Sequence, residues 1–113
     1  MTNFRETVRG DCLVIELEGK LDASTTPEIL ARLLEKIHSG QKYLALDFGA
    51  VSYMASSGLR MLLVLAATTS ELEGRLVLCG LDKTILDTLD VVGFLPNFQV
   101  VADRDAALAC LEK

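Results

Sequence analysis

The stretch VSYMASSGLR, residues 51–60, passes from a short apolar strand through two serines and a glycine into a helix. A serine at such a strand-to-helix turn exposes its hydroxyl to solvent. The helix that follows offers unpaired backbone N–H groups and the positive end of its dipole to a neighbouring anion. This junction therefore predicts a place where a phosphate group could act as a switch.

Hydrophobic periodicity and turn signals on both sides of the junction predict an alternation of strands and helices. Strands are expected over residues 4–8, 12–18, 43–48, 75–79 and 98–101. Helices are expected from a start signal at 25–28 to a stop at 39–40, and over residues 57–72, 81–89 and 103–111. This order predicts an α/β fold, with a four- or five-stranded mixed sheet and about four helices packed on it. The length of 113 residues fits one domain over residues 1–113.

Composition and charge restrict the classes of partner. The chain carries 16 acidic and 11 basic side chains, a net charge of −5, without a cluster of lysines or arginines. A nucleic-acid partner is therefore not expected. The longest unbroken apolar run, Met61 to Ala67, is far shorter than the roughly 20 residues of a membrane-spanning helix, and residues 1–6 do not resemble a signal peptide. We expect a cytoplasmic protein that does not insert into a membrane.

The sequence offers few residues for metal binding or hydrolysis. Its three cysteines, Cys12, Cys79 and Cys110, lie far apart among apolar neighbours, which is typical of buried thiols. With these and one histidine, His38, we expect no metal site and no cofactor. A serine nucleophile at the junction would need the G-x-S-x-G turn, which is absent, and would depend on His38 reaching the serine. We therefore expect a protein that is not an enzyme.

The helix predicted from Ser57 is apolar on more than one side. We expect its core stripe to comprise Leu59, Leu62, Leu63 and Ala66. Three further apolar residues fall on the opposite side: Met61, Val64 and Leu65. An apolar outer face predicts either a partner-binding surface or coverage by another element of the same chain, and the sequence leaves both open. The two serines also have a purely structural interpretation, as caps of this helix.

Four segments of the chain, residues 19–25, 44–48, 51–59 and 103–108, carry a recognisable pattern in their order and spacing. Together they resemble the STAS domain family of bacterial anti-sigma factor antagonists, over nearly the whole chain. The resemblance implies that a serine kinase, which is also the anti-sigma factor, phosphorylates Ser56, with Ser57 as the less favoured acceptor. The unmodified protein would bind this kinase and free the sigma factor, and a serine phosphatase would reset the switch.

The resemblance also implies a docking surface around Ser56. It places the segment from Asp22 to Thr25 near Ser56 at one end of the sheet, and it directs Arg60 outward from the first turn of the next helix. The predicted partner contacts are Asp22, Ser24, Thr25, Ser57, Arg60, Met61, Val64 and Leu65. The polar residues among them also have structural interpretations, as a turn aspartate, a helix cap or a solvated arginine. A weak homodimer stays open.

Ala55 departs from the family pattern, because many relatives have aspartate immediately before the phosphorylated serine. The missing carboxylate removes a group that could orient the hydroxyl or the kinase's metal ion. It also removes a like charge that would repel the phosphate, so the two consequences have opposite signs. Ala55 favours an alternative function: a STAS scaffold that is not phosphorylated and serves as a subunit of a transporter or of a signalling complex, through the outer face of its second helix.

Overall fold

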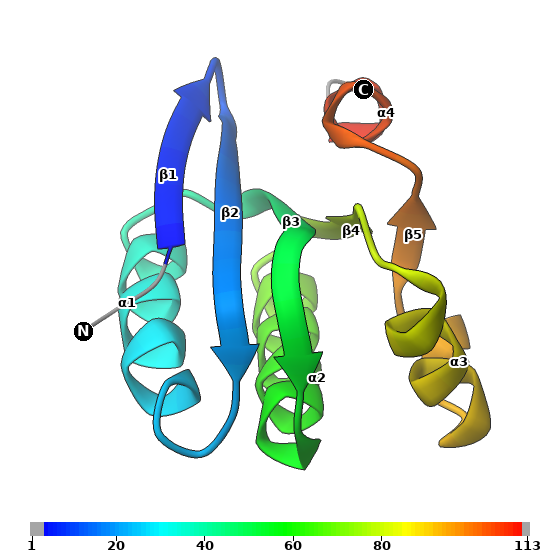
Figure 1. Cartoon of the computed structure of the whole chain (residues 1–113). Helices are drawn as coiled ribbons and strands as arrows, with labels where there is room; N and C mark the ends of the chain where they lie inside the picture. Colours follow the sequence, from blue (N-terminus) through cyan, green and yellow to red (C-terminus); the bar gives the residue numbers. More distant parts are fainter. Residues whose placement is uncertain (1–3, 112–113) are drawn as a thin grey trace.

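The computed structural model describes residues 4–111, except for the side chain of Asn97, so the ends of the predicted domain at 1–3 and 112–113 lie outside the described residues. The strands are β1 (Phe4–Arg9), β2 (Cys12–Leu21), β3 (Tyr43–Met54), β4 (Arg75–Cys79) and β5 (Gln99–Val101). The helices are α1 (Thr26–His38), α2 (Ser56–Glu71), α3 (Lys83–Val91) and α4 (Arg104–Leu111), with a short 3-10 helix, η1 (Leu95–Asn97). The predicted α/β fold with a mixed sheet is confirmed (Figure 1).

The five strands form one sheet in the order β1-β2-β3-β4-β5. β1 and β2 are antiparallel and are joined by a tight hairpin in which Gly10 has a φ of 61°, a conformation that glycine adopts without strain. The other neighbouring strands are parallel, so each connection between them must cross a face of the sheet. α1, α2 and α3 make these three crossovers.

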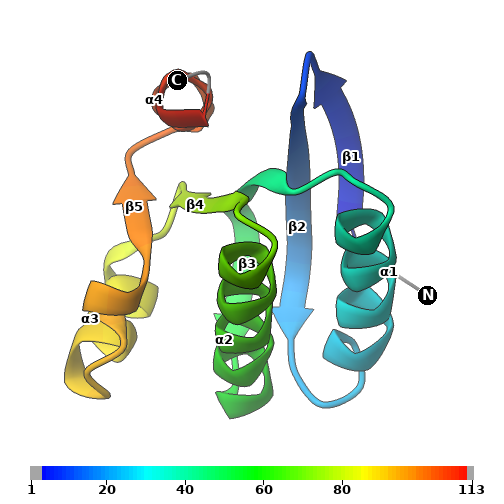
Figure 2. The same ribbon diagram turned by 180° about the vertical axis from the view of Figure 1, so that it is seen from behind.

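The helices cover the two faces of the sheet unequally (Figure 1 and Figure 2). α1 and α2 lie side by side behind the sheet in Figure 1, and α4 lies on the opposite face. Because side chains alternate along a strand, β2 and β3 supply residues to both faces. The main core, under α1 and α2, contains Leu13, Ile15 and Leu17 of β2 with Leu44, Leu46 and Phe48 of β3. A smaller cluster, under α4, includes Val14, Ala45, Val77 and Ala107.

The central strands β2 and β3 both extend further than predicted. β2 continues through Gly19, which has a φ of 74°, with two shifts in its register against β3. β3 is one strand over residues 43–54, so it extends the strand predicted at 43–48 and includes the short apolar strand expected before the serines. Bulges of this kind let a strand continue past residues that resemble a break. In the described register β4 pairs with β3 only as far as Asp47, so the ends of β2 and β3 project beyond β4.

Candidate functional site

The projecting ends of β2 and β3 bring two predicted segments together. Leu21, the last residue of β2, pairs with Met54, the last residue of β3. The backbone N–H of Ala55 then donates a hydrogen bond of 2.8 Å to the carbonyl oxygen of Leu21. The loop that begins at Asp22 therefore starts beside the residue that precedes Ser56, at the same end of the sheet (Figure 1).

Hydrogen bonds within the loop after β2 fix its shape. The Asp22 Oδ1 atom accepts hydrogen bonds from the backbone N–H of Ser24, at 2.9 Å, and from the Ser24 hydroxyl, at 2.7 Å. The Thr25 hydroxyl donates to the carbonyl oxygen of Lys20 at 2.8 Å. The bond from the Ser24 hydroxyl, followed by the bond from the Ser24 backbone, lowers the pKa of Asp22 below its ordinary value. Asp22 is therefore an ionised carboxylate at neutral pH.

α2 begins at Ser56, one residue earlier than predicted. Ala55 is the N-cap residue, with an extended backbone at φ −86° and ψ 177°, and within the described residues no side chain caps this helix. The Ala55 carbonyl oxygen accepts the first bonds of the helix, from the N–H groups of Gly58 at 2.9 Å and Leu59 at 3.3 Å. The interpretation of the serine pair as helix caps is therefore wrong, because both serines lie inside the first turn.

The two serines of the junction have different surroundings. Ser56 is exposed to solvent. The Oγ atom of Ser57 is buried, and the described part of the chain provides no hydrogen-bond partner for it. A modifying enzyme could therefore reach the hydroxyl of Ser56, whereas the protein itself shields the hydroxyl of Ser57.

Gly58 allows α2 to start close to the strand ends. A Cβ atom at this position would lie 2.6 Å from the Cγ atom of Met54 and 3.3 Å from the Cβ atom of Leu21. Any larger residue would therefore push the first turn of the helix away from β2 and β3. The third residue of the helix thus sets the distance between Ser56 and the strands that carry it.

The exposed apolar face predicted for α2 is wrong for two of its three residues. Met61 and Leu65 are only 1% and 0% exposed, and Val64 is half-buried. The buried face of α2 comprises Gly58, Leu59, Met61, Leu62, Leu65 and Thr69. This face is wide because α2 packs against both the sheet and α1, which is the coverage by the same chain that the sequence had left open. With apolar residues on most sides, the sequence of α2 does not specify which stripe faces the core.

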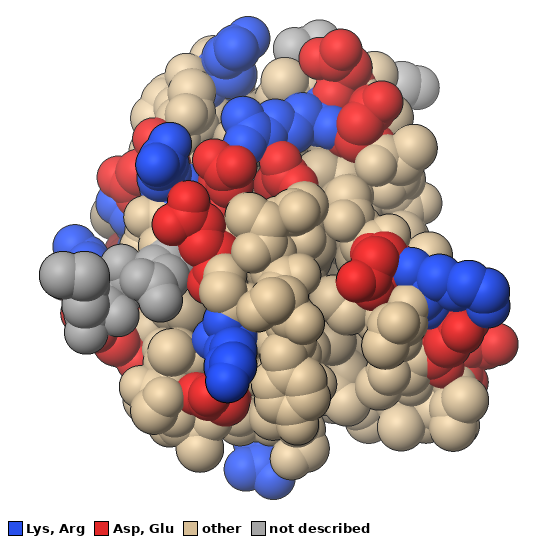
Figure 3. Space-filling model, in the orientation of Figure 1, with Lys and Arg blue, Asp and Glu red and all other residues tan. Residues whose placement is uncertain are grey.

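Two exposed side chains flank Ser56. Arg60 is exposed as predicted, one turn further along α2. Tyr53 is 54% exposed on the projecting end of β3, and its place within the junction, three residues before Ser56, is the signal in the sequence that could have indicated it. Beside Tyr53 lies a hollow of about 180 Å³ between the end of β3 and the first turns of α3. The end of β3 lies in the lower part of the view in Figure 1, and Figure 3 shows mostly uncharged side chains at the centre of this part, with charged ones above and at either side.

A second polar cluster ties α4 to the sheet. The Arg104 guanidinium contacts the carboxylate of Asp47 at 2.6 Å and that of Glu16 at 3.1 Å. Asp47 also accepts a hydrogen bond of 2.9 Å from the backbone N–H of Gly49. Burial, followed by the charge of Asp47, raises the pKa of Cys79 to about 11, so this thiol stays protonated. These groups satisfy one another, which indicates a structural cluster.

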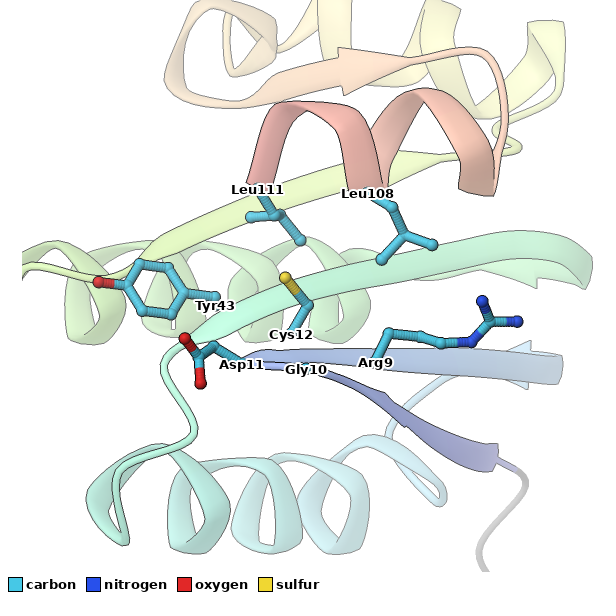
Figure 4. A pocket seen from close by; sticks show the side chains of 7 residues that line it. All are labelled: Arg9, Gly10, Asp11, Cys12, Tyr43, Leu108 and Leu111. Atoms are coloured by element: carbon cyan, nitrogen blue, oxygen red, sulfur yellow. The ribbon is translucent and has the colours of Figure 1, made fainter. Parts of the chain in front are cut away.

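The other features of the structure lie away from the junction. A hollow of about 520 Å³ lies between the β1–β2 hairpin and α4, where Leu108 and Leu111 point toward Cys12, and it includes none of the predicted site residues (Figure 4). Cys79 is buried like Cys12, and Cys110 is half-buried. Within residues 4–111 no three His, Cys, Asp or Glu side chains could hold a metal ion together. None of the described helices combines the length and the apolar composition that crossing a membrane requires.

Comparison with known proteins decides the family. Residues 3–107 match the sequence model of the STAS domain. The chain belongs to the STAS domain family. This confirms the resemblance based on the junction and its three companion segments. The STAS domain is similar to BtrV of Bordetella bronchiseptica, whose name places it among the anti-sigma factor antagonists, with 31% identity over 100 residues that cover 88% of this chain and 86% of BtrV.

Solved structures share the fold of this STAS domain. A Thermotoga maritima protein, also described as an anti-sigma factor antagonist, superposes with a TM-score of 0.92 at 12% identity, covering 97% of this chain and 95% of its own. The Bacillus cell fate determinant SpoIIAA, solved in its phosphorylated form, gives a TM-score of 0.76 at 24% identity, covering 95% of this chain and 98% of its own. At these identities the likeness establishes the fold and nothing finer.

Proposed function

We propose that this STAS domain is a cytoplasmic anti-sigma factor antagonist. In this proposal the unmodified protein binds an anti-sigma factor that is also a serine kinase, and so frees the sigma factor. Phosphorylation of Ser56 by that kinase ends the binding, and a serine phosphatase restores it. The domain acts as a binding module and not as an enzyme. The names of BtrV and of the Thermotoga maritima protein support this class of function.

One observation supports Ser56 over Ser57 as the phosphate acceptor. Ser56 is exposed at the first position of α2, whereas the Oγ atom of its neighbour Ser57 is buried. The N–H groups and the dipole of a helix start also favour a negative charge at this position. A phosphate on Ser56 would therefore be accessible to both kinase and phosphatase and compatible with the folded helix.

A phosphate on Ser56 would change the charge of the surface more than its shape. It adds about −1.5 to −2 charges and three acceptor oxygens. The adjoining loop already carries the ionised carboxylate of Asp22, so negative charge would accumulate where the partner docks. A loss of about 3 kcal/mol in binding free energy would weaken the complex more than about a hundredfold. Binding can therefore end without refolding of the domain.

The docking surface in this proposal is centred on the junction. It comprises Asp22, Ser24, Thr25, Tyr53, Ser56 and Arg60, with the half-buried Val64 at its margin. Met61 and Leu65 are excluded because they are buried in the core. Ser57 is excluded as a side-chain contact for the same reason. The surface therefore consists of polar side chains around one aromatic residue.

The acceptor can be tested with the cognate kinase and ATP. Intact-mass spectrometry is expected to show one added phosphate on the wild type and none on Ser56→Ala. The matched control is Ser57→Ala, which is expected to accept one phosphate at the wild-type rate. Modification of Ser56→Ala at an unchanged rate would contradict the assignment.

The alternative function, a permanent scaffold that is not phosphorylated, is favoured by Ala55. It relied on the outer face of α2, however, and both Met61 and Leu65 are buried. Ser56→Asp separates the two functions in a titration with the partner. An antagonist is expected to lose more than about a hundredfold in affinity, whereas a scaffold would keep its affinity. Ser70→Asp, exposed near the other end of α2, controls for the added charge.

A further inference from the structure

The start of α2 lacks the carboxylate that two other helices carry. At the start of α3, Asp82 Oδ1 accepts the N–H of Ile85 at 2.9 Å, and at the start of α4, Asp103 Oδ1 accepts the N–H of Ala106 at 2.9 Å. α2, the longest of the described helices, has Ala55 at this position and no acidic residue in its first turn. The positive end of its dipole is therefore not balanced by an acidic residue of its own.

Arg60 lies one turn after Ser56 on the same side of α2. Residues four apart on a helix have Cβ atoms about 5–6 Å apart, which brings a phosphate and a guanidinium within reach of each other. Arg60 is exposed, and within residues 4–111 its guanidinium makes no ion pair or hydrogen bond. The anion would also precede the cation, which is the more favourable order for such a pair on a helix.

We propose that Arg60 binds the phosphate on Ser56 within the same helix. The inference rests on the proposed function for the presence of that phosphate. A guanidinium presents planar N–H donors that match phosphate oxygens, and its bonds to them are assisted by charge. The ionised Asp22 on the adjoining loop opposes the phosphate, and Arg60 offsets this repulsion. The modified protein thus holds its phosphate against the first turn of α2.

Pairing of Arg60 with the phosphate also changes which side chains of the docking surface a partner can contact. In the unmodified protein, Arg60 is an exposed cation that an acidic side chain of the partner can contact. In the phosphorylated protein, the phosphate occupies this cation. Phosphorylation therefore adds the charge of the phosphate and also occupies the N–H donors of Arg60. A partner loses a hydrogen-bonding contact in addition to meeting the new charge.

The test measures the second pKa of the phosphate itself. It uses protein in which phosphoserine has been incorporated at position 56 during translation. The second pKa of the phosphate, ordinarily about 6, is followed by ³¹P NMR. A neighbouring cation lowers it, so Arg60→Gln is expected to raise the pKa, with about a twofold change in the proton dissociation constant. Arg60→Lys is expected to retain most of the lowering. Arg9→Gln, an exposed arginine at the end of β1 and at the opposite end of the sheet from Ser56, is the matched control and is expected to change nothing.

Each outcome of this experiment decides the proposal. A pKa that is the same in the wild type and in Arg60→Gln would overturn it, as would an equal shift in Arg9→Gln. The difference in phosphate pKa between the wild type and Arg60→Gln should also be smaller in 1 M salt, because salt screens exposed charges. Since the phosphoserine is introduced without a kinase, failure of the kinase to modify Ser56 would overturn the proposed function and leave this measurement intact.

Discussion

Within the described part of the chain, the polar groups at the start of α4 are paired, whereas those at the start of α2 are not. At α4, the Asp103 carboxylate caps the helix, and Arg104 pairs with Asp47. At α2, among the described residues, no side chain caps the helix, Ser56 is exposed and Arg60 lacks an ion-pair partner. The difference teaches that polar groups paired within the chain hold elements together, whereas the exposed groups at the start of α2 stay available to another molecule.

Replacement of Arg104 and of Arg60 tests this comparison with the largest expected difference in the free energy of unfolding. Arg104→Ala leaves the carboxylate of Asp47, only 15% exposed, without its cation, and is expected to lower the free energy of unfolding by about 1–3 kcal/mol. Arg60→Ala in the unmodified protein is expected to change it by less than about 0.5 kcal/mol. Urea unfolding of both variants measures the two values. Equal losses would show that the two arginines do not differ in role.

A cap added to α2 should make its start more like that of α4. The backbone of Ala55 is already extended, as an N-cap requires, so Ala55→Asp is expected to stabilise the unmodified protein by about 1 kcal/mol. Asp103→Ala should cost a similar amount at α4. Thermal unfolding gives both changes, and Ala55→Ser controls for repulsion between the new carboxylate and Asp22. A less stable Ala55→Ser variant would contradict the prediction.

Removal of the buried hydroxyl of Ser57 should be harmless or beneficial. A buried hydroxyl without a partner is unfavourable, so Ser57→Ala is expected to leave the free energy of unfolding unchanged or to raise it by up to about 1 kcal/mol. Ser70→Ala, at an exposed position of the same helix, gives the effect of the substitution alone. A clear loss of stability in Ser57→Ala, absent in Ser70→Ala, would reveal a partner for this hydroxyl.

The smallest expected effect is on the pKa of Asp22 and on the pH dependence of its contribution to stability. Its folded pKa lies below the ordinary value of 3.8, so its stabilising contribution is present above that value and is lost as the pH falls through the folded pKa. Ser24→Ala removes the hydroxyl that contributes most and is expected to raise the pKa of Asp22 toward 3.8. An NMR titration of the Asp22 carboxyl carbon measures this shift. An unchanged pKa would mean that the loop is not held by Ser24.

Local patterns predicted most of the fold. The order of strands and helices follows from periodicity, and the bounds of α1 follow from Thr-Pro-Glu at its start and Ser-Gly at its end. The extra length of β2 and β3 was missed because Gly19 and Gly49 resemble breaks, whereas pairing between the two strands carries them through. Register against a neighbouring strand is not visible in either segment alone.

The candidate site, like the fold, was predicted from the sequence only in part. The junction could be predicted because the strand, the serine pair and the helix are consecutive in sequence, and the resemblance to the family then selected Ser56. The burial of Met61, Leu65 and the Ser57 hydroxyl could not, because it depends on how α2 lies against its neighbours. The pair between Arg104 and its carboxylate partner on β3 joins residues 57 positions apart, and no local pattern indicates it.

The projecting end of β3 also bears on self-association. Beyond Asp47, the described register gives β3 a strand neighbour only in β2, so no described strand pairs with its other edge, and the start of α3 lies across a hollow from it. Open edges are usually guarded by charged side chains, but the exposed residues here, Ala50, Ser52 and Tyr53, are uncharged. A lysine in this stretch would protect the edge and would also alter the surface beside Ser56. The residues that would face another copy of the chain at this edge are therefore the same few that form the surface beside Ser56.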